Sequence, residues 1–356
     1  RRMTGHGRTG ARTAALLAAA VLVLGASPAR AIFKDAFVKL DDTAEKAVAR
    51  AQQWLARTQR DDGSWNTGHG RQNTGIIAYA ALALMVNGSV PGEGPYAEEI
   101  GKALQFLVNS QKENGIIVGP RSSHGPMYEH ALATLALVEA YGMTDNPRIR
   151  SAAIKAIDLI VESQHPSRGW RYQPQITNGD ISVTVMQVMA LRAAIEAGIY
   201  VPDVSITRAI RFIKHCYTPR EKGFGYTGPG NAAFARTGAG LVCLQTVGLH
   251  EDPIIPDVVE YLLEEGFRSK VNHYWYGHYY TSVGLYHYGG DPWKTYYPKI
   301  RRKIIDDWKK RGHYRSVLDT SWAILILGVP YRYLPIYQRE ACSMSAIRNP
   351  SRRHDR

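Results

Sequence analysis

Two kinds of helical pattern alternate along most of the chain. In the first kind, apolar residues recur at helical spacing on one face only, as Ile154, Ile157 and Val161 do. In the second kind nearly every position is apolar, as from 183 to 194. A one-sided helix lies at a surface, whereas a helix that is apolar on all sides has to be buried. The alternation therefore predicts helical hairpins with one outer and one inner member.

The second kind of segment recurs six times, at 75–86, 131–138, 183–194, 239–247, 281–288 and 322–329. Turn glycines mark the first four copies: Gly63, Gly115, Gly169 and Gly223 are 52, 54 and 54 residues apart. A fixed period of this length is typical of a helical-repeat architecture. We predict six hairpins, of which the last two are short and irregular.

Six hairpins can bury their apolar helices by closing into a ring. The inner helices then form one ring, the outer helices form a second ring around it, and closure removes the end faces that an open solenoid has to cap. The fold class expected is all-α, an (α/α)6 toroid or double ring of helical hairpins, spanning residues 32–340. An open solenoid is the competing architecture.

The first 31 residues have the pattern of a cleavable secretory signal. Arg1, Arg2, Arg8 and Arg12 precede an apolar stretch at 14–24, and the segment ends in Ala29-Arg30-Ala31. The alternative, a membrane anchor, needs about 20 apolar residues, more than this stretch has. We expect export to the periplasm, the cell envelope or the medium, with no transmembrane segment after cleavage.

The net charge of +13 is concentrated at the two ends of the chain. Residues 1–31 carry five of these charges and residues 341–356 carry three, which leaves five on residues 32–340. No basic stripe interleaved with aromatic residues appears, so we do not expect nucleic-acid binding. The end at 341–356 is expected to be a basic disordered tail.

Three cysteines are present, at Cys216, Cys243 and Cys342, without metal-type spacing. An odd number does not describe a disulfide framework. Cys216 and Cys243 lie within helical patterns, and we expect both to be buried as small apolar residues.

The turns carry a recognisable motif. The first copy, from Gln59 to Gly63 and Trp65, has the form Q-x-x-x-G-x-W, and the second keeps Gln111 and Gly115. The third and fourth copies read Gly-Trp-Arg-Tyr at 169–172 and Gly-Phe-Gly-Tyr at 223–226. Glycine is expected to permit the tight turn, and the ring to pack between hairpins.

Over residues 43–335 these motifs resemble the terpenoid cyclase and protein prenyltransferase superfamily, which contains prenyltransferase and squalene oxidase repeats. The resemblance implies an all-α toroid of six hairpins. Triterpene cyclases of this family have two such helical domains, whereas this chain has one.

In a closed double ring, polar residues at the starts of the inner helices meet at the mouth of a central cavity. Three of them are candidate general acids, because a carboxyl group beside an apolar cavity has a raised pKa: Asp180, Asp319 and Glu129. Aspartate is also a preferred N-cap, so Asp180 and Asp319 have a structural interpretation as well.

The resemblance implies further roles only in part. Cyclases of the family that protonate an alkene use D-x-D-D at the start of an inner helix. Here Asp180 falls on the proton-donating position of Asn178-Gly179-Asp180-Ile181, but both flanking acids are replaced. His278 resembles the zinc-binding histidine of the prenyltransferases, but no D-x-C pair accompanies it. We therefore predict no metal and no cofactor.

The candidate ligand-binding residues lie at the same rim and in an aromatic stretch at 272–297. That stretch either lines a pocket or fills core volume. The candidates are His130, Thr184, Arg236, His278, Tyr279, Tyr280 and Trp322.

Three functions fit these observations. The first is a cyclase-like or prenyltransferase-like protein with an apolar, aromatic-lined cavity. Such a protein acts on or binds an isoprenoid-type or other apolar small molecule, and Asp180 is the acid if it is an enzyme. The second is a non-catalytic binding or scaffold protein of the cell envelope. The third is a carbohydrate-active enzyme, since helical toroids also form lyases and glycoside hydrolases. No feature indicates a particular protein partner.

Overall fold

The computed structural model describes residues 42–68, 72–120, 125–268, 271–331 and 334–338. Outside these ranges lie the predicted signal segment 1–31 and the predicted basic tail 341–356, which includes Cys342. Both predicted ends of the toroid, residues 32 and 340, also lie outside them. Among the described helices, none is long and apolar enough to cross a membrane.

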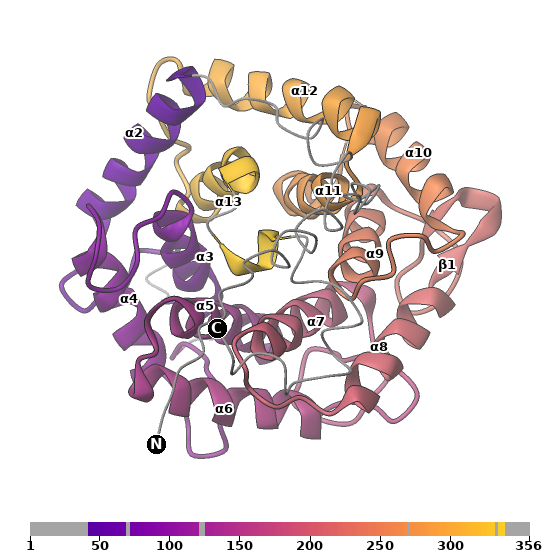
Figure 1. Cartoon of the computed structure of the whole chain (residues 1–356), viewed down its shortest axis with the longest axis horizontal. Coiled ribbons are helices and arrows are strands. Elements are labelled where there is room, and N and C mark those ends of the chain that lie inside the picture. The colour runs from indigo at the N-terminus through magenta and orange to yellow at the C-terminus, as the bar shows by residue number, and fades with distance from the viewer. Residues whose placement is uncertain (1–41, 69–71, 121–124, 269–270, 332–333, 339–356) are drawn as a thin grey trace, which may run out of the picture.

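The described helices form two concentric rings (Figure 1). Outer and inner helices alternate along the chain, as the two kinds of pattern predict. The outer ring consists of α2 (Asp42–Thr58), α4 (Ala97–Asn109), α6 (Pro147–Glu162), α8 (Asp203–His215), α10 (Ile255–Glu265) and α12 (Gly290–Trp308). The inner ring consists of α3 (Thr74–Met85), α5 (Pro126–Thr144), α7 (Ile181–Glu196), α9 (Phe234–Thr246), α11 (Tyr274–Tyr288) and α13 (Val317–Gly328).

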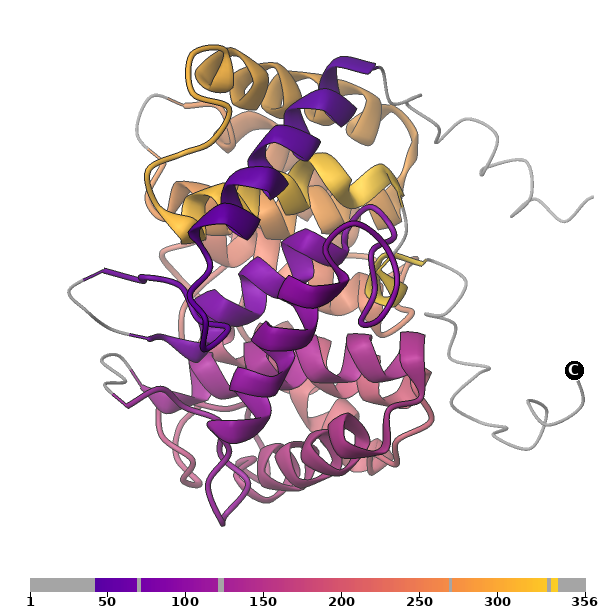
Figure 2. The same cartoon turned by 90° about the vertical axis from the view of Figure 1, so that its left-hand side faces the viewer.

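Both rings close, which confirms the toroid and excludes the open solenoid. The last inner helix, α13, packs against the first, α3, and the last outer helix, α12, packs against α2. Figure 2 shows α2 running beside α12 and α4 on the outside of the molecule. The contact between α13 and α3 is close: a Cβ atom on Gly328 would lie 2.2 Å from Cγ2 of Val86.

The last two hairpins are not short, contrary to the sequence prediction. Helix α11 has 15 residues and α12 has 19. Their pattern is hard to read because α11 is built from tyrosines and glycines in place of aliphatic residues, and because Pro298 lies inside α12. Buried aromatic rings, such as those of Trp293, Tyr296 and Tyr297, provide the apolar contact here.

A glutamine in each of the first three turns joins two neighbouring outer helices. The Gln59 amide donates to the carbonyl of Gly63 in its own turn (3.1 Å) and to that of Glu99 on α4 (2.8 Å). Gln111 repeats this arrangement with Gly115 (3.1 Å) and Ala152 of α6 (2.9 Å). In the third copy, Gln164 donates to Ser205 of α8 (2.8 Å).

The turn glycines have two different roles, whereas the sequence suggested one. Gly63 and Gly115 have φ values of +86° and +90°, a conformation that favours glycine. Gly169 and Gly223 are needed for close packing instead, because added Cβ atoms would lie 2.0 and 2.8 Å from the hydroxyls of Thr184 and Thr237.

The turn aromatics pack as expected. Two buried indoles also hydrogen-bond the preceding outer helix, Trp65 to the Leu55 carbonyl (2.8 Å) and Trp170 to that of Ile160 (2.7 Å).

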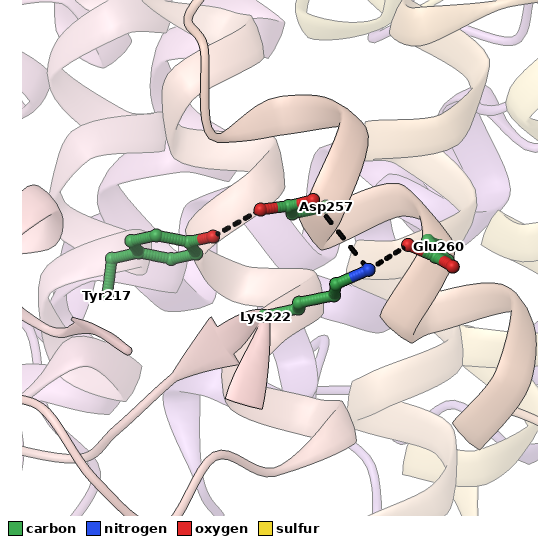
Figure 3. Close-up of polar contacts among 4 residues, drawn as sticks. All are labelled: Tyr217, Lys222, Asp257 and Glu260. Atoms are coloured by element: carbon green, nitrogen blue, oxygen red, sulfur yellow. Dashed lines mark hydrogen bonds and ion pairs between the residues drawn. The ribbon is translucent and has the colours of Figure 1, made fainter. Parts of the chain in front are cut away.

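The fourth turn contains the only strands among the described residues, β1 (Tyr217–Thr218) and β2 (Gly223–Phe224), with η1 (Pro219–Glu221) between them. Polar contacts hold this turn on α10 (Figure 3). The Tyr217 hydroxyl donates to Asp257 (3.0 Å), and Lys222 pairs with both Glu260 and Asp257. These groups lie at the outer surface and have a structural role.

The axis of the ring is filled at the carboxyl ends of the inner helices. After α13 the chain turns inward through η2 (Val329–Tyr331) to η3 (Pro335–Tyr337), which packs against α5 and α7. We call residues 334–338 the plug. Buried tyrosines fill the space between the plug and the middle of the ring. The hydroxyl of Tyr337 in the plug contacts that of Tyr279 (3.3 Å), and the hydroxyls of Tyr79 and Tyr280 contact each other (3.1 Å). Cys216 and Cys243 are also buried, as predicted.

Candidate functional site

A pocket of about 580 Å³ opens at the other end of the ring, where the inner helices begin. All six inner helices line it through their first turns, and the loops before α7 and α9 add one tyrosine each. Its wall consists of Asn73, Gly75, Ile76, Tyr79, Tyr128, Glu129, Leu132, Tyr172, Ser182, Met186, Tyr226, Ala235, Arg236, His273, Tyr276, Leu318 and Trp322. The pocket thus lies at the predicted rim.

Most of this wall is apolar or aromatic. Ile76, Leu132 and Met186 form an aliphatic part, and five tyrosines and Trp322 form the rest of the apolar surface. The Tyr79 ring contacts Trp322 edge-on at the bottom, with ring centres 5.5 Å apart. A pocket of this composition suits a mainly apolar ligand with few polar groups.

Asp180 caps α7 and lies behind the wall. Its Oδ1 accepts hydrogen bonds from the Val183 amide (2.9 Å) and the Ser182 hydroxyl (2.6 Å), so the predicted capping role is confirmed. Its Oδ2 is buried without a partner. Burial raises the pKa of Asp180, against the opposing effects of these hydrogen bonds and of the Arg171 charge.

A chain of hydroxyl groups connects Asp180 with the pocket. Ser182 donates to Asp180, and the Tyr128 hydroxyl lies 2.6 Å from the Ser182 oxygen. Both Tyr128 and Ser182 line the pocket, whereas Asp180 does not. A proton from Asp180 would therefore reach a ligand through two hydroxyl groups.

Glu129 lines the pocket, but its carboxylate is committed to the fold. One oxygen, Oε2, accepts hydrogen bonds from the Thr74 amide and hydroxyl (3.0 Å each) and from the Gly119 amide (3.1 Å). These bonds fix the start of α3 to α5.

Asp319 is not the cap of α13, contrary to the structural interpretation of the sequence. The cap is Ser316, whose hydroxyl accepts from the Asp319 amide (3.2 Å). Asp319 is half-buried, and burial raises its pKa. Its neighbours Leu318 and Trp322 line the pocket, but Asp319 does not.

Of the seven predicted ligand-binding residues, Arg236 and Trp322 line the pocket. His130 and Thr184 instead hold the turns: the His130 Nδ1 atom accepts from the Ile117 amide, and the Thr184 hydroxyl accepts from the Trp170 amide (3.1 Å each). Both side chains are buried behind the wall.

His278, Tyr279 and Tyr280 are also buried and do not line the pocket. The His278 Nδ1 atom lies 2.5 Å from the Tyr296 hydroxyl, and burial lowers the pKa of His278 to about 3. The aromatic stretch at 272–297 therefore mainly fills core volume, and Tyr276 is its tyrosine that reaches the pocket.

None of the five tyrosines of the wall was among the predicted ligand-binding residues: Tyr79, Tyr128, Tyr172, Tyr226 and Tyr276. Tyr172 and Tyr226 follow the turn glycines by three residues in consecutive copies, and their hydroxyl groups hydrogen-bond each other. This 54-residue spacing was the signal that could have identified them. Tyr79 and Tyr276 carry no such signal, because their inner helices are apolar on every face.

No group of three or more His, Cys, Asp or Glu side chains suited to a metal ion occurs in the described part of the chain.

No protein-family model and no curated protein sequence matches the chain. Solved structures do match in fold. One is an inactive variant of the α-1,6-mannanase GH76A of Salegentibacter sp. HEL1_6 in complex with α-1,6-mannotriose, with 8% identity and a TM-score of 0.58. Another is a sugar epimerase from a ruminal bacterium, with 12% identity and a TM-score of 0.58. Each alignment covers 81% of this chain and 98% of the other.

A type II terpene cyclase from Scytonema, in complex with geranylgeranyl dihydroxybenzoate, also matches, with 11% identity over 83% of this chain and 98% of that one. Its TM-score is 0.30, too low to carry an argument. The likenesses establish an (α/α) toroid and do not single out the terpenoid cyclase superfamily among proteins with this fold.

Proposed function

We propose that the chain is a binding protein whose pocket takes a small, mainly apolar molecule, of which isoprenoids are one class. One observation carries the proposal: the inner ring opens into a pocket of about 580 Å³ with a largely apolar and aromatic wall. Filling such a wall removes apolar surface from water, which favours binding by roughly 25 cal/mol per Å².

The acidic groups of the site favour binding over catalysis. A general acid has to come within hydrogen-bond reach of the reacting atom. Glu129 is the pocket's one carboxylate among the described residues, and its Oε2 already accepts three hydrogen bonds. Asp180 is separated from the pocket by Ser182.

A carbohydrate ligand is the alternative suggested by the mannanase and the epimerase of similar fold. Tyrosine and tryptophan rings in the wall would stack on a sugar ring. Glycoside hydrolysis, however, generally uses two carboxyl groups on either side of the bond that breaks. The wall offers Glu129 alone, so this alternative is sugar binding rather than hydrolysis.

A second candidate function is acid catalysis, favoured by the path from Asp180 through Ser182 to Tyr128. In that reaction Asp180 carries its proton on Oδ1, and the hydrogen bonds along the path reverse so that each hydroxyl donates toward the pocket. The Tyr128 hydroxyl then protonates the ligand, Ser182 returns a proton to Tyr128, and Asp180 returns one to Ser182. The raised pKa of Asp180 favours the protonated form that this path requires.

The binding proposal is tested by calorimetric titration of the full chain with farnesol and, separately, with α-1,6-mannotriose. We expect farnesol to bind and mannotriose not to bind. In the variant Leu132→Trp, the indole fills the pocket and lowers the affinity for farnesol at least tenfold. The matched control is Val204→Trp, because Val204 is 48% exposed on α8.

Circular dichroism verifies that both variants are folded. Farnesol binding that survives Leu132→Trp would place the ligand elsewhere and contradict the proposal. Mannotriose binding that Leu132→Trp abolishes would favour the carbohydrate alternative.

A further inference from the structure

Two arginines lie around one tyrosine at the mouth of the pocket. The guanidinium carbon of Arg171 is 6.0 Å from the centre of the Tyr226 ring and 5.5 Å from that of Tyr172. The guanidinium carbon of Arg236 is 5.9 Å from the Tyr226 ring. Arg171 comes from the third turn and Arg236 from the first turn of α9, so two repeats each place one charge near the same ring. Arg236 lines the pocket, whereas Arg171 does not.

Neither guanidinium forms an ion pair with a carboxylate in the described part of the chain. Arg236 donates one hydrogen bond, to the Asn231 carbonyl, and its Nε is buried without a protein partner. A buried donor without a partner is unfavourable unless a ligand or water satisfies it. The donor thus points to an acceptor that the protein does not supply.

The carboxylates of this region are already committed. Glu129 binds the start of α3, and Asp180 caps α7. Glu221 accepts from the amides of Asn231 and Ala232, which holds the loop before α9. Burial also raises the pKa of Asp180, which favours its neutral form. The mouth therefore has two guanidinium groups that no carboxylate pairs with in the described part of the chain.

The backbone adds to this charge. Helix α9 begins at the pocket, and its N-cap residue Ala233 provides no side-chain hydrogen bond. The first amides of a helix have no partner within the helix, and the helix dipole places partial positive charge at this end. Helices α3 and α7, by contrast, are capped by the side chains of Asn73 and Asp180.

Below this mouth the wall is apolar, so the pocket has a charged end and an apolar end. We propose that its ligand carries an acidic group, a carboxylate or a phosphate, that binds the Arg236 guanidinium beside the Tyr226 ring, with the Arg171 charge near the same ring, while an apolar body extends toward Leu132 and Met186. Arginine suits this role because its planar fork donates two parallel hydrogen bonds to either anion. This inference rests on the proposed binding function.

The test compares three probes with the same ten-carbon chain: decyl phosphate, decanoate and decanol. Calorimetric titration of the full chain is expected to give an affinity at least tenfold higher for an anionic probe than for decanol. Added salt should weaken the anionic probe more than decanol, because ions screen the exposed mouth. A preference between phosphate and carboxylate identifies which acidic group is recognised.

Single variants then locate the charge. Arg236→Gln is expected to lower the affinity for the preferred anion at least tenfold and to change that for decanol less than twofold. Arg171→Gln should lower the affinity for the anion by a smaller factor, because Arg171 lies near the same ring without lining the pocket. Arg236→Lys keeps the charge without the fork and should show an intermediate loss. The matched control is Arg211→Gln, an exposed arginine on α8.

The outcomes separate the two proposals. Equal binding of all three probes, abolished by Leu132→Trp, would overturn the acidic-group inference and leave the binding function in place. Binding of no probe and of no farnesol would overturn the binding function itself. If an arginine variant does not fold, the comparison of probes and the salt dependence with the unaltered protein still decide the inference.

Discussion

The two oxygens of the Asp180 carboxyl group have different roles: one accepts the hydrogen bond that caps α7, and the other is buried without a partner. Its Oδ1 satisfies the Val183 amide at the start of α7, while Oδ2 has no partner in the protein. A substitution that keeps the first function and removes the acid can therefore separate capping from chemistry.

We expect Asp180→Asn to change the free energy of unfolding little, because asparagine caps a helix about as well as aspartate. Asp180→Ala should lose about 1 kcal/mol, the usual effect of removing a cap. Urea denaturation measures both. With linear isoprenoids, we expect no cyclised product from the unaltered protein by gas chromatography and mass spectrometry.

Cyclised product from the unaltered protein that Asp180→Asn and Tyr128→Phe both abolish would replace the binding proposal with the acid path. Product that is unaffected by Asp180→Asn would exclude Asp180 as the acid and direct attention to Asp319 or Glu129.

A second buried carboxyl group, Glu139, holds the plug. Its Oε2 accepts from the Ile336 amide (3.4 Å), and its Oε1 is buried without a partner. Burial raises the pKa of Glu139 from 4.5 to about 8, and the Glu196 charge adds to the effect. The nearby hydroxyls of Tyr279 and Tyr337 provide no positive charge, and Arg192 pairs with Glu196.

This shift predicts a pH dependence of stability. Between pH 4.5 and about 8 the unfolded carboxyl group has lost its proton and the folded one has kept it. The unfolded state then binds fewer protons, so this group makes stability fall as pH rises, by about 1.4 kcal/mol per unit. Glu139→Gln should remove this contribution.

Urea denaturation at pH 5, 6, 7 and 8 measures the difference between the two proteins. The variant should gain stability relative to the unaltered protein as pH rises, and Glu162→Gln, an exposed residue on α6, should not. Parallel curves for Glu139→Gln and the unaltered protein would show that Glu139 is ionised in both states.

At the scale of elements, the turn glutamines show how the repeat holds neighbouring outer helices together. Gln111 donates from one amide group to its own turn and to α6. Replacing it removes two hydrogen bonds to half-buried carbonyl oxygens, and a hydrogen bond contributes about 0.5–1.5 kcal/mol to stability.

We therefore expect Gln111→Leu to lower the free energy of unfolding by about 1–3 kcal/mol. The matched control is Gln105→Leu on α4, the helix that precedes this turn, where the glutamine is exposed and bonds only Asn109 among the described residues. Urea denaturation compares the two. Similar losses for both variants would contradict a bridging role.

The glycine of the third turn offers a separate test. A Cβ atom on Gly169 would lie 2.0 Å from the Thr184 hydroxyl, whereas one on Gly101 in α4 meets nothing within 4 Å. Gly169→Ala should destabilise by about 1–3 kcal/mol through overpacking. Gly101→Ala should stabilise the protein by roughly 0.5–1 kcal/mol because alanine favours a helix. Equal changes in the melting temperature of the two variants would contradict the packing explanation.

The elements also show what could be predicted from the sequence. Apolar periodicity and the turn glycines predicted all six inner helices, because burial on every side leaves a clear pattern. The roles of His130 and Thr184 could not be predicted, since a polar residue in the first turn of an inner helix can face either the pocket or a turn. Only the direction of the side chain, which depends on packing between hairpins, decides between them.

For the whole molecule, closure of the ring makes each hairpin depend on two neighbours. The contact of Gly328 with Val86 joins the last inner helix to the first. Gly328→Ala is expected to destabilise the entire ring by about 1–3 kcal/mol through overpacking. Val86→Ala in the same chain should recover part of this loss, because it removes the methyl groups that the new Cβ meets.

Far-ultraviolet circular dichroism and tryptophan fluorescence are expected to report one shared unfolding transition in both proteins. Separate transitions for the two signals would indicate that hairpins unfold independently, as in an open solenoid. Full additivity of the two substitutions would contradict direct contact across the closure.

The filled axis has a kinetic consequence. In the described part of the chain, the tyrosines beneath the pocket and the plug close the far end of the ring, so a ligand enters through the mouth beside Tyr172 and Tyr226. A molecule that enters and leaves by the same entrance crosses the same transition state in both directions. A bulky group placed at the edge of the mouth, without touching the bound ligand, would slow association and dissociation by equal factors. Residence time would lengthen while the equilibrium affinity stayed the same.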